Sequence, residues 1–201
     1  MAMHAPPQLI LATRNPHKTA EITAMLGDRF KVLDVTAFPE CPQIEETGTT
    51  LLENARLKAL GISRRINGWV LADDSGLEVD SLQGAPGVWS SSFGGQDGNH
   101  ALNNTHLLTA MQGHTTRSAR FRCTMVLAQN GHEQGHFSGS VEGRIIDAPR
   151  GQLGFGYDPL FIPDGYEQTF AELGENVKNT LSHRARALAK VVDFLNHHSP
   201  K

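Results

Sequence analysis

The chain has 201 residues, 39% of them hydrophobic, which is enough to bury a core without disulfides or structural metals. Its 18 basic and 21 acidic side chains give a net charge of −3, so no bulk attraction to nucleic acid is expected and no nucleic-acid partner is predicted. The distant cysteines Cys41 and Cys123 predict neither zinc ribbon nor disulfide, and without a signal-peptide pattern at Met1–Pro7 or a run of ~20 apolar residues we expect a cytoplasmic protein with no membrane partner.

The first third of the chain alternates between strand and helix patterns. In chain order it predicts a strand at 9–13, a helix at 18–26 closed by Gly27, a strand at 30–35, a helix from about 50 to 66, and a strand at 69–72 that ends at the segment Asp73-Asp74-Ser75-Gly76. This β-α-β-α-β order favours an α/β sheet with a site at the carboxyl ends of its strands.

The remainder predicts a different arrangement. A Gly/Ser-rich loop at 84–98 leads to a helix around 100–111, and apolar and polar residues then alternate over 120–127 as in a half-buried strand. Asn130-Gly131 predicts a hairpin turn, so this half is expected to be antiparallel. A last helix is predicted from Ser182, its capping residue, to about Asn196.

A candidate phosphate loop, residues 13–18, lies between the first strand and the first helix. Free backbone N–H groups and the positive end of the helix dipole favour an anion there, and Lys18 adds a full charge. The segment has no glycine and is not a Walker A motif, so an ordinary strand-to-helix loop is the alternative.

Two acidic pairs, Glu45-Glu46 and Asp73-Asp74, provide the hard oxygen ligands that suit Mg²⁺. Plain surface acids are the alternative, but a pair directly after a buried strand would lie at the mouth of the sheet. On the long helix, Asn54 and Lys58 are four residues apart and share a face that could point at the same phosphates or at solvent.

The glycine-rich segment 151–159 allows close approach of backbone to a ligand, and Phe155 is the candidate platform for a base. A hairpin with a buried Phe is the alternative. Lys178, His183 and Arg184 cluster at the start of the last helix, where the dipole disfavours cations, and this conflict favours a ligand-binding purpose over plain surface charge.

The segment 132–136 matches a metalloprotease motif but is not predicted to bind zinc. His132 to His136 fits the H-E-x-x-H pattern of zinc proteases, which requires both histidines on one face of a helix. Asn130-Gly131 precedes this segment and Gly135 lies inside it, so a hairpin strand is predicted instead.

Taken in this order, the segments resemble the inosine triphosphate pyrophosphatase family, whose members act on ITP, dITP and XTP. The matching stretches extend from Leu9 to the last helix, and their combination is far more specific than any one of them. They are 11–18 with Glu21, 45–48, 53–55 with 58–59, 72–77, 84–87, 154–159, 171–173, and Lys178 with 182–184.

The resemblance implies an α/β fold: a long twisted mixed β-sheet with flanking helices and two lobes around a central cleft. It also implies one pyrophosphatase domain over residues 1–201, ordered from about 8 to 197, and a homodimer. The implied cofactor is Mg²⁺, one per subunit or more, and the implied ligand is a purine nucleoside triphosphate.

Site roles carry over by position. Asp74 matches the proton acceptor and a metal carboxylate, and Glu45 or its neighbour Glu46 matches a second metal carboxylate. The substrate-binding positions are Thr13, Arg14, Asn15, Pro16, His17, Lys18, Ser75, Phe155, Gly156, Tyr157, Asp158, Lys178, His183 and Arg184. Lys58 joins them only by inference from its helix face. The family's phosphate loop often has glycines where this chain has Arg14 and His17, so we expect a stiffer loop or additional contacts to the polyphosphate.

The expected reaction is hydrolysis of ITP, dITP or XTP to a nucleoside monophosphate and pyrophosphate, which cleanses the nucleotide pool. Donors on His183 and Arg184 would favour the oxygen at position 6 of the base over the amino group of adenine. The alternatives are a pyrophosphatase for another modified nucleotide and a non-catalytic nucleotide-sensing module. The acidic pairs argue against a sensor, because they would repel a triphosphate unless a metal is used.

Overall fold

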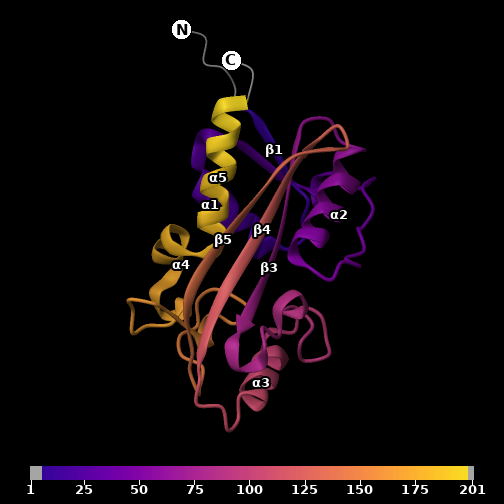
Figure 1. Ribbon diagram of the computed structural model, residues 1–201. Helices are drawn as coiled ribbons and strands as arrows, with labels where there is room; N and C mark the ends of the chain where they lie inside the picture. The colour runs from indigo at the N-terminus through magenta and orange to yellow at the C-terminus, as the bar shows by residue number, and fades with distance from the viewer. Residues whose placement is uncertain (1–5, 199–201) are drawn as a thin grey trace. The chain divides into compact units, whose positions relative to one another are not determined.

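The computed structural model describes residues 6–198 (Figure 1). Residues 1–5 and 199–201 lie outside this range. The excluded N-terminal residues are most of the segment Met1–Pro7, for which the sequence predicts no signal peptide. The chain divides into two compact units. Unit 1 comprises the described residues up to Asp74 together with 124–137 and those from Leu188 on, and unit 2 comprises 75–123 and 138–187.

Six strands form one mixed sheet in the order β2-β1-β3-β4-β5-β6. They are β1 (Gln8–Leu11), β2 (Lys31–Asp34), β3 (Trp69–Val79), β4 (Ser118–Gln129), β5 (His132–Ile145) and β6 (Phe161–Pro163). β1 pairs in parallel with both β2 and β3, whereas β5 and β6 are antiparallel. The prediction of an α/β fold with a mixed sheet and flanking helices is therefore confirmed.

Unit 1 has helices on both faces of its part of the sheet (Figure 1). Helix α2 (Leu51–Ser63) lies on one side, and α1 (Pro16–Leu26) and the later part of α5 (His183–His198) lie on the other. Strand residues are apolar on both faces because both are covered. On the α2 side the core comprises Ile10, Ala12, Val70, Ala72, Val126 and Ala128 of the sheet region with Ala55, Ala59 and Ile62 of the helix.

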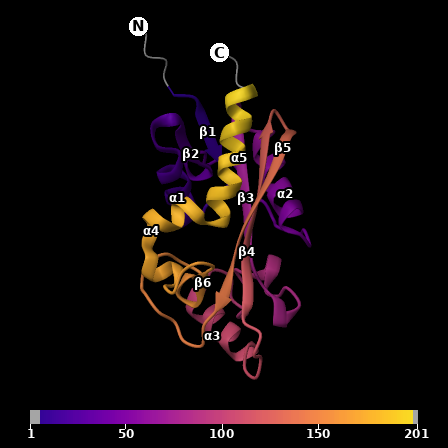
Figure 2. The same ribbon diagram turned by 60° about the vertical axis from the view of Figure 1, so that its left-hand side comes forward.

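Unit 2 has its own core around the remaining parts of β3, β4 and β5. Helices α3 (His100–Ala110) and α4 (Phe170–Leu181) flank this core, and Figure 2 gives a clear view of β6 and α4. The core includes Leu77, Val79, Phe121, Val141, Ile145, Leu160, Phe161 and Phe170, with Leu107 and Met111 from the region of α3. Short 3-10 helices complete the chain: η1 (Gly27–Arg29), η2 (Val35–Ala37), η3 (Asp80–Leu82), η4 (Gly87–Trp89) and η5 (Asp158–Leu160).

Several local predictions are confirmed by hydrogen bonds close in sequence. Gly27 closes α1, and the Ser182 hydroxyl accepts from the Ala185 N–H at the start of α5. Asn130 and Gly131 both have positive φ, at 52° and 79°, as the tight turn between β4 and β5 requires. Neither Cys41 nor Cys123 forms a disulfide, and both are buried.

Other predictions needed correction. β3 does not end at the segment 73–76 but continues to Val79, because Leu77 and Val79 are apolar and enter the core of unit 2. The sequence reading missed α4, although Thr169 and Glu172 form a capping box that marks its start. His132 and His136 lie on β5, as predicted, so they lack the helical geometry of a zinc protease. Within residues 6–198, no helix is long and apolar enough to span a membrane.

Candidate active site

The predicted phosphate loop, residues 13–18, connects β1 to α1 in unit 1. Asn15 caps α1, and its Oδ1 accepts the backbone N–H groups of His17 at 2.9 Å and Lys18 at 3.4 Å. Pro16 at the first helical position has no N–H. The expectation that these amides are free is therefore wrong, because the Asn15 side chain already accepts them. The charge available to an anion here is that of Lys18.

Arg14 binds a segment far from it in the sequence. Its guanidinium donates to the backbone carbonyl of Cys41 at 2.8 Å and so fixes the loop to the segment after η2. The Thr13 hydroxyl accepts the Asn15 N–H at 3.1 Å. These bonds favour the stiffer loop, of the two possibilities that the sequence left open for Arg14.

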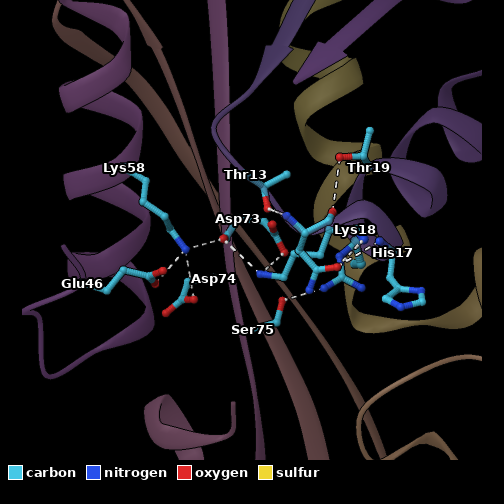
Figure 3. A network of polar contacts seen from close by, with 11 residues as sticks. Thr13, His17, Lys18, Thr19, Glu46, Lys58, Asp73, Asp74 and Ser75 are labelled. Atoms are coloured by element: carbon cyan, nitrogen blue, oxygen red, sulfur yellow. Dashed lines mark hydrogen bonds and ion pairs between the residues drawn. The ribbon is translucent and has the colours of Figure 1, made fainter. Parts of the chain in front are cut away.

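Lys58 on α2 is the centre of a polar network in unit 1 (Figure 3). Its Nζ lies 2.8 Å from Glu46 Oε2 and 3.3 Å from Asp74 Oδ1, and it donates to the backbone carbonyl of Asp73 at 2.9 Å. Burial acts to lower the pKa of Lys58, but the surrounding carboxylates outweigh it and raise that pKa. The side chain therefore stays protonated, and its single ammonium group contacts both carboxylates.

Lys18 approaches the same stretch of β3 from α1. Its Nζ lies 3.3 Å from Asp73 Oδ2 and 3.5 Å from the Asp73 carbonyl that Lys58 also contacts (Figure 3). The register explains this convergence. β1 pairs with β3 only up to Leu11 opposite Leu71, so the chain leaves the sheet just where Asp73 and Asp74 begin.

Asp74 is buried, with 8% of its surface exposed, and desolvation raises its pKa although Lys58 and then Lys18 act to lower it. Its Oδ1 faces Lys58, whereas no described residue donates a hydrogen bond to the buried Oδ2. A buried carboxylate with a raised pKa and an unused acceptor has the properties of a general base.

The acidic residues fit a magnesium ion. Asp74 Oδ2 and the carboxylate of Glu46, 43% exposed, offer hard oxygen ligands, and Mg²⁺ in proteins uses one or two carboxylates with water and substrate phosphates. Among the described residues, no three acidic, histidine or cysteine side chains converge to form a complete cage. Both residues of the predicted pair are exposed, and of the two it is Glu46 that contacts Lys58.

A second group of predicted site residues lies in unit 2. Asp158 and Lys178 form an ion pair of 2.6 Å with both side chains 3% exposed. Asp158 also accepts the N–H of Phe155 at 2.9 Å, and the Lys178 ammonium lies 4.6 Å from the centre of the Phe155 ring. Gly154 makes this fold of the loop possible, since a Cβ there would overlap Asp158 Oδ2. The structure thus brings Phe155, Asp158 and Lys178 together.

His183 and Arg184 begin α5, and both are buried. The His183 ring stacks on Phe121 at 4.9 Å, and Arg184 donates to the Ser75 hydroxyl at 3.2 Å with its guanidinium carbon 5.8 Å from the Phe155 ring centre. The Arg184 guanidinium is therefore a buried, charged hydrogen-bond donor beside the Phe155 ring.

Three residues singled out in the sequence have other surroundings. Tyr157 is 4% exposed, lies in the core of unit 2 and donates its hydroxyl to the Ser90 carbonyl at 2.8 Å. His17 is exposed on the first turn of α1. Asn54, expected to share a face with Lys58, is buried and accepts the Gly48 N–H at 2.8 Å, so it fixes the loop that carries Glu46.

Asp74 of the first group and Ser75 of the second are consecutive residues of β3, at the boundary between the two units in the sequence. From the sequence, Asp73 was named only for its carboxylate, as one of an acidic pair suited to Mg²⁺, whereas in the structure its backbone carbonyl accepts from both lysines. No sequence pattern could reveal that carbonyl, because every residue has one. The sequence reading also passed over Asn104 of α3, which donates to the Gly156 carbonyl.

Comparison with known proteins finds relatives along nearly the whole chain. Residues 9–194 match the Ham1 family. The chain is 46% identical over 185 residues to a dITP/XTP pyrophosphatase of Exiguobacterium sp., which covers 92% of this chain and 94% of that protein. A dITP/XTP pyrophosphatase of Geobacter sulfurreducens is 45% identical over 192 residues, covering 94% and 96% of the two chains.

Solved structures give the same result. A HAM1 protein from Coxiella burnetii superposes with a TM-score of 0.86 at 38% identity, covering 95% of this chain and 99% of that one. The Ham1 protein of Staphylococcus aureus gives a TM-score of 0.85 at 33% identity, covering 96% and 100%. By sequence along nearly its whole length and by fold, this chain belongs to the Ham1 family.

Proposed function

We propose that this protein hydrolyses deaminated purine nucleoside triphosphates, namely ITP, dITP and XTP, to the monophosphate and pyrophosphate. Its relatives carry the name dITP/XTP pyrophosphatase at 45–46% identity. The structural observation that carries the proposal is the network in which Lys58 joins Glu46 and Asp74 while Lys18 contacts Asp73. A buried base beside two cations and spare carboxylate oxygens suits the transfer of a phosphoryl group to water.

In this proposal Asp74 is the general base. It takes a proton from a water molecule whose oxygen attacks the α-phosphorus, and the bond from that phosphorus to the bridging oxygen breaks as pyrophosphate leaves. Lys18 and Lys58 neutralise charge on the phosphate oxygens, and no covalent intermediate is needed. Fixed charges in a buried site stabilise the transition state because they need no reorganisation during the reaction.

Mg²⁺ is the cofactor we propose, held by Asp74 and Glu46. When bound, it would supply Lewis-acid polarisation and charge neutralisation at the phosphates. The protein's own contribution is to keep the two carboxylates close to Lys58, so that their positions are fixed before nucleotide arrives.

Base selection is assigned to unit 2. Phe155 offers an aromatic face, and Lys178, His183 and Arg184 offer donors for the oxygen at position 6 of hypoxanthine or xanthine. Adenine presents an amino group at that position and would leave such donors unpaired, a mismatch that can discriminate by ~10⁴ or more.

The decisive experiment measures pyrophosphate release from ITP, dITP, XTP, ATP and modified pyrimidine triphosphates, with Mg²⁺ and with EDTA. We expect turnover of the first three, at least about 10²-fold above ATP, and loss of turnover in EDTA. Comparable rates with ATP would exclude a preference for deaminated purines. A preference for a pyrimidine triphosphate would favour a pyrophosphatase for another modified nucleotide, and tight binding without cleavage would favour a nucleotide sensor. The homodimer stays a prediction from the family resemblance, and the cytoplasmic location stays a prediction from the sequence pattern.

A further inference from the structure

Helix α3 of unit 2 contacts the loop that carries Phe155. The side-chain Nδ2 of Asn104 donates to the backbone carbonyl of Gly156 at 3.1 Å. His100 lies four residues earlier, on the same face of α3, and its ring centre is 6.0 Å from that of Phe155. One face of α3 therefore adjoins two consecutive residues of the glycine-rich loop.

This contact complements the one made by Asp158. Asp158 holds the loop through the Phe155 N–H, and Asn104 holds it through the Gly156 carbonyl, two peptide units further along the chain. Gly156 has a φ of 63°, a conformation that glycine adopts readily, so without these bonds its backbone would sample other conformations. The two hydrogen bonds together fix the backbone before and after the Phe155 side chain.

The orientation of the Asn104 amide is determined by its partner. An exchange of its oxygen and nitrogen would place two acceptors against each other at the Gly156 carbonyl. In the observed orientation Oδ1 is buried, and no described residue donates to it. A buried acceptor without a donor costs stability, so the geometry at Asn104 is better explained by what Nδ2 does for the loop than by packing alone.

Helix α3 is itself well fixed, which makes it a suitable support. Asn99 caps its first turn by accepting the Leu102 N–H at 3.1 Å. The neighbouring Asn103 accepts the Gly94 N–H at 2.7 Å and donates to the Ser91 carbonyl at 2.8 Å. Asn103 thus attaches α3 to the preceding loop, while Asn104 projects from the anchored helix to the Phe155 loop.

From this geometry we propose that Asn104 is a positioning residue for base recognition. It holds the Gly156 carbonyl so that Phe155 presents its ring in one orientation to the purine. This inference rests on the proposed function, because it assumes that Phe155 stacks on the base. Asn104 itself contacts no reacting atom, so its loss should weaken nucleotide binding through the base and leave the phosphate chemistry of unit 1 unchanged.

The test compares Asn104→Ala with Thr105→Ala, its exposed neighbour on α3, whose hydroxyl donates to the Ala101 carbonyl of the same helix. KM and kcat are measured with ITP, and inhibition is measured with inorganic tripolyphosphate, which has no base. For Asn104→Ala we expect KM to rise about 3- to 10-fold, the change that one net hydrogen bond supplies, with kcat and the tripolyphosphate inhibition constant within about twofold of wild type. Thr105→Ala should match wild type in all three.

Asn104→Asp provides a second variant of the same shape. It replaces the Nδ2 donor with an oxygen that repels the Gly156 carbonyl, so its KM should rise at least as much, even if the alanine variant proves too unstable to assay. An unchanged KM in either folded variant, or an equal weakening of tripolyphosphate inhibition, would overturn the positioning role. Absence of ITP turnover in the wild-type protein would instead refute the proposed function, and with it this inference.

Discussion

The ammonium group of Lys58 lies 3.3 Å from Oδ1 of Asp74, while the other carboxylate oxygen of Asp74 is buried and receives no hydrogen bond from the described residues. The two oxygens of one side chain are therefore in different environments. One fixes the orientation of the carboxylate through Lys58, and the other remains available to accept a proton or a cation. This asymmetry suits a side chain that must stay in place while it exchanges a proton.

Replacement of Asp74 by Asn removes the proposed base with little change of shape. We expect kcat for ITP to fall by ~10² to 10⁴, the usual contribution of a general base, while nucleotide binding is largely retained. Steady-state kinetics and isothermal titration with ITP measure the two effects. Asp28→Asn, an exposed aspartate of unit 1, is the matched control and should behave as wild type. Near-normal turnover of Asp74→Asn would exclude the assigned role.

The pH dependence of kcat should report the environment of Asp74. Burial raises the pKa of this carboxyl, so the ionised, active form should be lost on acidification at a higher pH than for an ordinary aspartate. Lys58 lowers the pKa of Asp74 and so opposes that rise. Lys58→Met should therefore move the acidic limb of the pH profile to still higher pH, whether or not the maximal rate also falls. The exposed Lys31→Met is the control. A limb that stays in place or moves toward acid would contradict the coupling of Lys58 to Asp74.

Glu45 and Glu46 form a natural pair for a metal test, because they are adjacent, identical in type and differ in contacts. Only Glu46 reaches Lys58, at 2.8 Å. We expect Glu46→Gln to raise the Mg²⁺ concentration for half-maximal activity about tenfold and Glu45→Gln to change it less than about threefold. A Mg²⁺ titration of ITP hydrolysis measures both. The reverse order would assign the metal contact to Glu45.

Gly154 should tolerate no side chain. Its φ of 76° disfavours other residues by roughly 1–2 kcal/mol, and an added Cβ would in addition overlap Asp158 Oδ2. Gly165→Ala is the control, since Gly165 has a φ of 85° but a Cβ added there would meet nothing within 4 Å. Thermal unfolding should show a larger loss for Gly154→Ala, accompanied by a raised KM for ITP in that variant alone. Equal losses would mean that the contact with Asp158 is not important.

The buried pair of Lys178 and Asp158 should show strong coupling in a double-mutant cycle. Lys178→Met leaves a buried carboxylate without its cation, which typically costs ~3–5 kcal/mol of unfolding free energy. Asp158→Asn in the same chain should recover part of that loss, since Asn can still accept the Phe155 N–H. Urea unfolding measures the cycle. The exposed pair of Arg144 and Glu167 is the control, and Arg144→Met should cost less than about 1 kcal/mol. Additive effects at Lys178 and Asp158 would show that the two side chains are not coupled.

Features that depend on neighbours in the chain were predictable from residue type and spacing. The end of α1 at Gly27, the turn at Asn130-Gly131 and the cap at Ser182 each rest on backbone conformation or hydrogen bonds within a few residues. Such interactions need no tertiary structure, so residue type and spacing are sufficient to predict them. The same local signal was available for α4 at Thr169 and Glu172, where it was overlooked.

Which charged groups contact one another depends on how the helices and strands pack. Lys58 could have faced solvent, and its contact with Asp74 depends on how α2 rotates and packs against the sheet through Ala55 and Ala59. The pairing of β1 with β3 ends at Leu11 and Leu71, and the loop that follows β1 therefore brings Lys18 to Asp73. The contact of Asn104 with Gly156 joins residues 52 positions apart. Sequence spacing cannot specify contacts of this kind, because small changes in helix rotation or strand register move a side chain to a different neighbour.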